Sequence, residues 1–124
     1  QEHQDPHGKS QIQVRSVLAG DSRMTYQGLI RIAEQAVNTT AYQYHKSVLL
    51  SSTARVQSVP SLEVLTHQVR CGHGSATASL DAEQLWYLNT RGLDNQVASQ
   101  LIMSSFLSAV TPTQYLKKLV AYIT

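Results

Sequence analysis

The apolar residues of this chain change their spacing once, near residue 80, and that change limits the folds open to it. Before it, short runs alternate apolar and polar residues with the period of two that a β-strand requires. After it, apolar residues recur at the spacing of amphipathic helices. We therefore expect a mainly β region over residues 1–80 and a helical tail of about three helices over residues 81–124.

Alternation is clearest over residues 11–18 and 24–32, with a turn at 19–22 between them. Shorter strands are expected, in order, at 48–50, 54–58, 62–64 and 69–71, the last extending to 79. Loops are expected at residues 1–10 and 33–41. No helix-length apolar pattern separates the strands, which argues against strand–helix–strand units. A sandwich, a barrel and a parallel β-helix all remain open, because no repeat period is evident.

The helical tail carries clear boundary signals. Asp81 is placed to cap a first helix that Gly92 ends, and Asp94 is placed to cap a second helix. In the second helix the expected face comprises Val97, Leu101, Ser104 or Ser105, and Leu107 or Ser108, with Ile102, Phe106 and Val110 beside it. The last helix follows a capping box at residues 111–114. Its apolar face either covers the β region or binds a partner, and it comprises Leu116, Leu119, Val120 and Ile123.

Composition excludes several classes of protein. The 42% apolar content is enough for one globular domain, and a single cysteine cannot form an internal disulfide. The net charge of +2 comes without a run of Lys or Arg, so no nucleic-acid or membrane-surface binding is expected. No apolar run approaches the length of a membrane span, and a reduced cytoplasmic setting is expected. The polar start at Gln1 suggests a fragment of a longer protein, whose open β-edges favour self-association.

Two metal-binding residue types occur together at Cys71 and His73. In a strand, residues two apart point to the same side, and thiolate plus imidazole suits iron, zinc or copper. Two ligands are too few for a closed zinc or iron–sulfur site, so any metal contact is transient or completed by a second chain. The structural alternatives are a buried packing cysteine and a hydrogen-bonded histidine in a turn. The flanking Gly72 and Gly74 supply either a positive φ angle or close backbone approach.

Other polar residues have weaker functional alternatives. Tyr42, Tyr44 and His45 are expected on a loop, as a contact patch or as scattered aromatics without a role. Glu63 is expected to face outward from a strand, solvated or at an interface. There is no nucleophile–base motif, P-loop or paired-carboxylate signature, so we do not expect an enzyme.

The stretch around Cys71 resembles the SufB/SufD family of iron–sulfur cluster assembly proteins, and its SufD branch more than its SufB branch. The resemblance lies in Val48-Leu49-Leu50-Ser51, in Pro60-Ser61-Leu62-Glu63-Val64 and in Val69-Arg70-Cys71-Gly72-His73-Gly74. It continues through Leu80-Asp81, Leu85-Trp86-Tyr87-Leu88 and Arg91-Gly92-Leu93. The C-x-H-G block followed by the Y-L-x-x-R-G block is a quite specific part of the resemblance. The sequence departs from the family pattern at His67-Gln68, where an acidic pair is usual, so His67 is an additional potential ligand.

The resemblance implies the end of a right-handed parallel β-helix followed by a small helical domain. It implies a non-catalytic scaffold that pairs with a SufB-like subunit and binds a SufC-like ATPase through its helical tail. It also implies that His73, and less directly Cys71, offers ligands to iron or a transient iron–sulfur cluster at a subunit interface. Two alternatives remain open: a pure protein-interaction module with structural Cys71 and His73, and a free-standing metal-binding β-protein.

Overall fold

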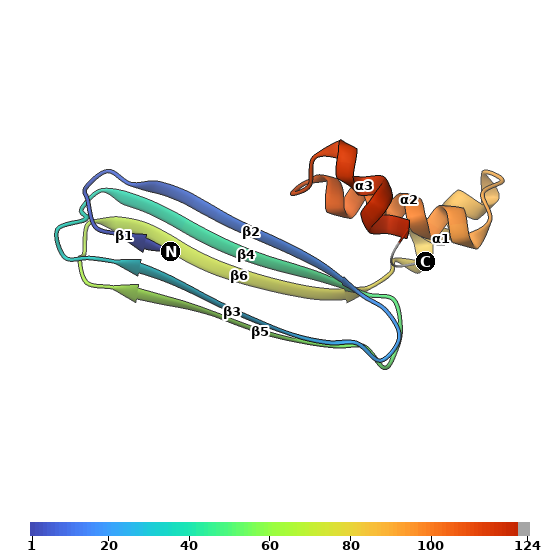
Figure 1. Ribbon diagram of the computed structural model, residues 1–124, viewed down its shortest axis with the longest axis horizontal. Coiled ribbons are helices and arrows are strands. Elements are labelled where there is room, and N and C mark those ends of the chain that lie inside the picture. Colours follow the sequence, from blue (N-terminus) through green and yellow to red (C-terminus); the bar gives the residue numbers. More distant parts are fainter. Residues whose placement is uncertain (122–124) are drawn as a thin grey trace. The chain divides into compact units, whose positions relative to one another are not determined.

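The computed structural model of the chain describes residues 1–121. In this part of the chain six strands precede three helices (Figure 1). The strands are β1 (Glu2–His3), β2 (Lys9–Leu18), β3 (Arg23–Ile32), β4 (Thr39–Leu49), β5 (Arg55–Val64) and β6 (Val69–Ser79). The helices are α1 (Ala82–Thr90), α2 (Asn95–Ser108) and α3 (Thr113–Ala121). The expectation of a mainly β chain with three C-terminal helices is confirmed.

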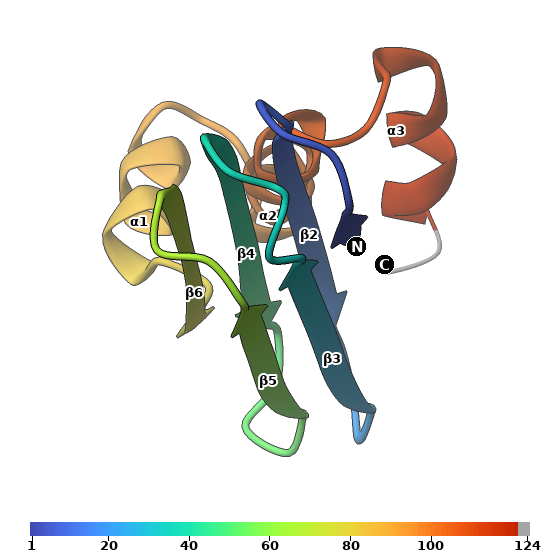
Figure 2. The same cartoon turned by 90° about the vertical axis from the view of Figure 1, so that its left-hand side faces the viewer.

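The strands form two three-stranded sheets, ordered β1-β3-β5 and β2-β4-β6. Consecutive strands therefore belong to opposite sheets, and each sheet contains every second strand (Figures 1 and 2). The pairing of β1 with β3 is parallel, with Glu2 beside Arg31 and His3 beside Ile32. A chain that returns to the same sheet after each turn forms the coils of a β-helix-like fold. Of the three alternatives left open by the sequence, the parallel β-helix is the one that agrees with this topology.

The residues divide into two compact units, each made of several segments. Unit 1 comprises Gln1–Val14, Met24–Lys46 and Val56–Ala76. Unit 2 comprises Arg15–Arg23, Ser47–Arg55 and Thr77–Thr124, described here to residue 121. The apolar core of unit 1 is a cluster of Ile30, Ile32, Ala36 and Ala41.

Strand β3 shows why the alternating sequence forms a half-buried strand. Ile30 and Ile32 are fully buried. Leu29 before them and Arg31 between them are exposed. The predicted turn before β3 is confirmed, because the Ser22 N–H donates to the Ala19 carbonyl. In this strand, every second residue at the C-terminal end faces the core, as the period of two in the sequence predicted.

Several predicted boundaries are wrong. The expected loop over residues 33–41 ends earlier, because β4 begins at Thr39. Of the expected short strand at 48–50, Val48 and Leu49 are the end of β4 and Leu50 lies outside it. Within residues 1–10, the structure contains β1 and the start of β2. Strand β5 continues through Pro60, which is allowed because β5 lies at the edge of its sheet.

The helix caps agree with the sequence analysis. The Asp81 side chain accepts hydrogen bonds from the backbone N–H groups of Glu83 and Gln84, at the start of α1. After α1, Gly92 adopts a φ of 90°, the left-handed conformation that commonly ends a helix. The Asp94 carboxylate caps α2 by accepting from the Val97 N–H.

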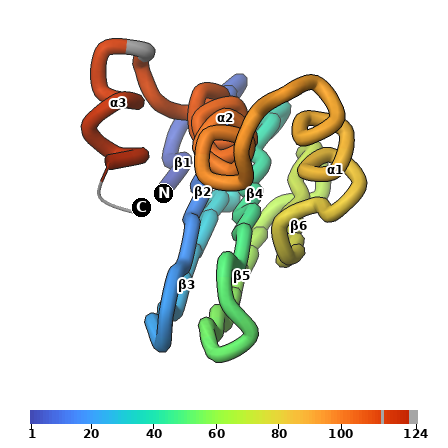
Figure 3. Tube along the Cα trace, turned by 90° about the vertical axis from the view of Figure 1, so that its right-hand side faces the viewer, coloured from blue at the N-terminus to red at the C-terminus, as the bar shows by residue number. Residues whose placement is uncertain are grey.

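The buried face of α2 agrees only in part with the expected one. Leu107 is buried as expected, together with Ala98 and Met103, whereas Val97 and Leu101 are exposed. Helix α2 packs against both α1 and α3 and lies between them (Figure 3). Because α2 has neighbours on two sides, a single apolar stripe in its sequence does not predict which of its residues are buried.

Candidate functional site

Strand β6 carries the predicted pair Cys71 and His73. It lies at the end of the sheet order β2-β4-β6, so β4 is its only neighbouring strand among the described residues. Because side chains alternate along a strand, Cys71 and His73 project from one face and Gly72 and Gly74 lie on the other. The strand therefore presents thiol and imidazole from the same side.

The two side chains differ in burial. Cys71 is a free, half-buried cysteine that packs against the core cluster containing Ile30 and Ile32. His73 is exposed. The Cys71 sulfur thus contributes to the packing of unit 1, whereas the His73 imidazole is accessible to a metal ion or to another chain.

The glycines beside His73 lie under two tyrosine rings of β4. A Cβ atom added at Gly72 would lie 3.3 Å from the Tyr42 ring, and one added at Gly74 would lie 3.3 Å from the Tyr44 ring. Neither glycine has a positive φ angle. Of the two alternatives for these glycines, close approach is therefore the one that the structure supports.

Cys71 and His73 do not belong to a larger ligand cluster in the described residues 1–121. No group of three or more His, Cys, Asp or Glu side chains there could hold a metal ion. Structural zinc sites and iron–sulfur sites usually require about four protein ligands. The described part of the chain can therefore supply only part of such a ligand set.

Glu63 and His67 occupy separate places in unit 1. An oxygen of the Glu63 carboxylate lies 3.0 Å from a guanidinium nitrogen of Arg31, and both side chains are nearly half exposed. His67 is exposed in the connection between β5 and β6, where it lines a polar hollow with Gln68 and Arg70. The structure thus gives Glu63 an ion-pair partner.

Unit 1 contains a polar cluster around the buried side chains of Gln43 and His45, which the sequence analysis did not predict. The Tyr26 hydroxyl donates to Oε1 of Gln43 at 3.1 Å, and Nε2 of Gln43 donates to the Ser61 carbonyl at 2.8 Å. Nδ1 of His45 is hydrogen-bonded to the Ser58 hydroxyl at 3.1 Å. We call these five residues the polar core cluster.

His45 was expected on a loop, and this expectation is wrong. It lies on β4 with only 1% of its surface exposed, and burial lowers its pKa. Tyr42 and Tyr44 also lie on β4 rather than on a loop. The available signal was the spacing of two that separates Ala41, Gln43 and His45, which places all three on one face of a strand.

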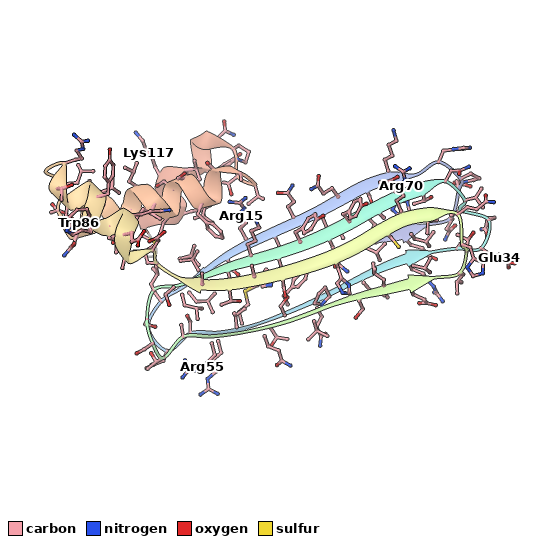
Figure 4. The ribbon with its side chains drawn as sticks, turned by 180° about the vertical axis from the view of Figure 1, so that it is seen from behind. Arg15, Glu34, Arg55, Arg70, Trp86 and Lys117 are labelled. Carbon is pink, nitrogen blue, oxygen red and sulfur yellow. The ribbon has the colours of Figure 1, made fainter. Side chains whose placement is uncertain are left out.

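Unit 2 contains a hollow of about 800 Å³ with a largely apolar lining. Tyr87 and Leu88 of α1 and Leu101 and Phe106 of α2 contribute to it. Trp86 projects from α1 nearby (Figure 4). Its side chain is 69% exposed. The two helices therefore display large apolar side chains to solvent.

The three predicted partner-binding residues of the tail have different surroundings. Leu116 is buried within the chain, whereas Leu119 is 41% exposed. Ile123 lies outside the described residues. On α3, Leu119 is thus the predicted contact residue that the structure shows at the surface.

Comparison with known proteins identifies the family. Residues 1–106 match the family model described as SUF system FeS cluster assembly, SufBD core domain. The chain belongs to the SufBD family. The match includes the whole of β6, and so both Cys71 and His73, whereas α3 lies beyond it.

Three curated relatives illustrate the SufBD similarity. The iron-sulfur cluster assembly protein SufD of Escherichia coli is 31% identical, over 78% of this chain and 23% of that protein. Protein ABCI7, chloroplastic, of Arabidopsis thaliana is 34% identical, over 85% of this chain and 22% of that protein. A SufBD family protein of Mycobacterium leprae is 31% identical, over 98% of this chain and 34% of that protein. This chain thus spans between about a quarter and a third of the length of these SufBD relatives.

Among residues 1–121 of this SufBD chain, no helix has both the length and the apolar character needed to cross a membrane.

Proposed function

We propose that this chain is a SufD-like, non-enzymatic scaffold in iron–sulfur cluster assembly, with His73 as a ligand at an interface with a SufB-like subunit. The observation that carries the proposal is the exposed His73 on an edge strand of a SufBD-family chain. We propose that the protein acts in the cytoplasm. We also propose that its coils are right-handed, because nearly all connections between parallel strands have this hand.

A shared site follows from the number and kind of ligands. Imidazole and thiolate both bind iron, but Cys71 and His73 fall short of the usual four protein ligands. Cys71 is also half-buried against the core cluster, so His73 is the better-placed donor. The cluster is then cargo held transiently between two chains, with the remaining ligands supplied by the partner.

The helices of unit 2 support a second contact, with a SufC-like ATPase. Monomeric proteins rarely expose contiguous apolar patches, and interfaces are enriched in large aromatic side chains. Trp86 on α1, Leu101 on α2 and Leu119 on α3 are 69%, 51% and 41% exposed. We expect Trp86→Ala and Leu119→Asp variants to lose the ATPase while the SufB-like subunit stays bound. Retention of the ATPase by both variants would remove the helices from this interface.

Open strand edges support self-association when the SufB-like partner is absent. Strands β2 and β6 are the two edges of one sheet in the described chain, and unpaired edges promote association. We expect the SufB-like subunit to compete with this self-association, which sedimentation with and without that subunit measures. A self-associated fraction that the partner leaves unchanged contradicts this expectation.

The test of the proposed function is anaerobic reconstitution of the assembled complex with iron and sulfide. Wild type is compared with His73→Ala and with His67→Ala, because His67 is the other exposed histidine that the sequence marks as a potential ligand, two residues before β6. We expect all three complexes to assemble, with the iron content and visible absorbance falling only for His73→Ala. Equal cluster content in the three complexes would refute a ligand role for His73.

One observation favours a second candidate, a pure interaction module. Cys71 packs against the core cluster as a small apolar side chain would. In that case Cys71 and His73 are structural, and the sheets and helices only hold partners together. Unchanged cluster content in His73→Ala, together with intact partner binding, would select this alternative.

A further inference from the structure

Tyr42 and Tyr44 form a stacked pair on the outer face of β4. Their ring centroids lie 6.2 Å apart and their planes are inclined by 8°. The intervening residues of β4, including Gln43 and His45, are buried, so the tyrosines occupy the opposite face of the strand. The rings thus lie on the side of the sheet away from the polar core cluster.

Each ring lies where a side chain of β6 would otherwise be. A Cβ atom at Gly72 would be 3.3 Å from Cδ1 and Cε1 of Tyr42, and one at Gly74 would be 3.3 Å from Cδ1 of Tyr44. These distances are shorter than ordinary van der Waals contact for a Cβ atom. Only glycine leaves this space free without moving the rings.

Strand β6 needs such support around His73. Glycine weakens a strand, because it loses more conformational freedom on folding and provides no side chain to pack. The strand is also an edge with β4 as its only neighbour in the described chain, and its last residues, 75–79, are all exposed. An aromatic ring placed across a glycine on the next strand is a known means of stabilising such a pairing.

We propose that Tyr42 and Tyr44 are positioning residues for His73. Their rings cover Gly72 and Gly74, hold this part of β6 against β4 and thereby fix the direction in which the imidazole projects from the other face. The tyrosines act through the glycine backbone and do not touch the cargo. This inference rests on the proposed role of His73 as a ligand.

Hydrogen exchange and NMR of the whole chain test the positioning directly. In a Tyr42→Ala/Tyr44→Ala variant, we expect amide exchange at residues 72–74 to become about tenfold faster, with protection of Ile30 unchanged. The imidazole resonances of His73 should move toward those of an unstructured histidine. A Tyr42→Phe/Tyr44→Phe variant keeps both rings and should match wild type.

Two further variants keep the test decisive. Gln13→Ala is the control, because Gln13 is an exposed residue of β2, which does not pair with β6. If the double alanine variant does not fold, Tyr44→Ala alone carries the measurement at Gly74. Unchanged exchange and unchanged His73 resonances in the folded alanine variant would overturn the proposal.

Cluster reconstitution separates this inference from the proposed function. If His73→Ala lowers cluster content, the alanine variants of the tyrosines should lower it too, and the phenylalanine variants should restore it. Wild-type cluster content in the alanine variants would overturn the positioning role while leaving His73 as a ligand. If His73→Ala itself changes nothing, the proposed function fails and the positioning role fails with it.

Discussion

The ring of Tyr26 lies 4.5 Å from the imidazole of His45, with the two planes inclined by 37°. Tyr26 belongs to β3 and His45 to β4, which are strands of different sheets. The contact therefore connects the two sheets within unit 1 through an aromatic and a titratable side chain. The polar core cluster around this contact leads to specific predictions about how the stability of the fold depends on pH and on side-chain packing.

The stability of the fold should depend on pH through His45. In the unfolded chain a histidine has a pKa of about 6.5, and burial lowers the pKa of His45 in the folded chain. As the pH falls through about 6.5, the unfolded chain therefore binds the proton first, and the free energy of unfolding decreases. We expect urea unfolding to show lower stability at about pH 5.5 than at about pH 7.5.

A His45→Gln variant serves as the comparison for this pH effect. Glutamine keeps a polar side chain at the position but does not titrate. The variant should lose part of the wild-type decrease in stability on acidification. An identical pH dependence in both proteins would show that His45 does not cause it.

Gly28 should be intolerant of substitution, because the polar core cluster fills the space beside it. A Cβ atom there would approach Oε1 of Gln43 and the Tyr26 hydroxyl more closely than real Cβ atoms approach any neighbour. We expect Gly28→Ala to lower the free energy of unfolding by about 1–3 kcal/mol. The neighbouring exposed position provides the control, and Gln27→Ala should change stability little. Equal stability of the two variants would contradict the packing described here.

Cys71 should behave as a packing residue in stability measurements. Cys71→Ser places a hydroxyl against the core cluster, which costs about 1–3 kcal/mol if the hydroxyl finds no partner. Cys71→Ala loses only a small side chain and should be less destabilised. Chemical denaturation of both variants provides the measurement. A Cys71→Ser variant as stable as wild type would mean that the thiol does not pack in the core.

The ion pair between Glu63 and Arg31 should contribute little. Both side chains are nearly half exposed, and exposed pairs typically contribute no more than about 1 kcal/mol. We expect Glu63→Gln to shift stability within that range and to leave cluster content unchanged in the reconstituted complex. A large loss of cluster with intact folding would instead restore Glu63 as a site residue.

The sequence predicted the parts of the fold in which apolar residues alone mark the inner face. Strand β3 was recognised because Ile30 and Ile32 follow Tyr26 and Gly28 on one face at a spacing of two. Helix α1 was recognised because Asp81 and Gly92 mark its ends. Strand β4 was missed for most of its length, because its inner face carries buried polar residues, including Gln43 and His45. Buried polar groups are stabilised by hydrogen bonds to partners distant in sequence, which a pattern of hydrophobicity does not reveal.

The geometry of the candidate site could be predicted only in part, because it too depends on contacts between residues distant in sequence. Spacing alone placed Cys71 and His73 on one face of a strand. It could not distinguish the surroundings of the two side chains, because the burial of Cys71 depends on the core cluster of unit 1, whose residues lie far earlier in the chain. The rings of Tyr42 and Tyr44 over Gly72 and Gly74 likewise depend on the pairing of β4 with β6.

The central claim is that the imidazole of His73 binds the iron of a nascent cluster. The most direct measurement is pulsed electron paramagnetic resonance of the reduced cluster, with isotope-labelled histidine in this chain only. The account predicts a nitrogen hyperfine coupling that changes with the label, is lost in His73→Ala and persists in His67→Ala. A cluster that forms without any coupling to labelled nitrogen, or with a coupling that survives in His73→Ala, would contradict it.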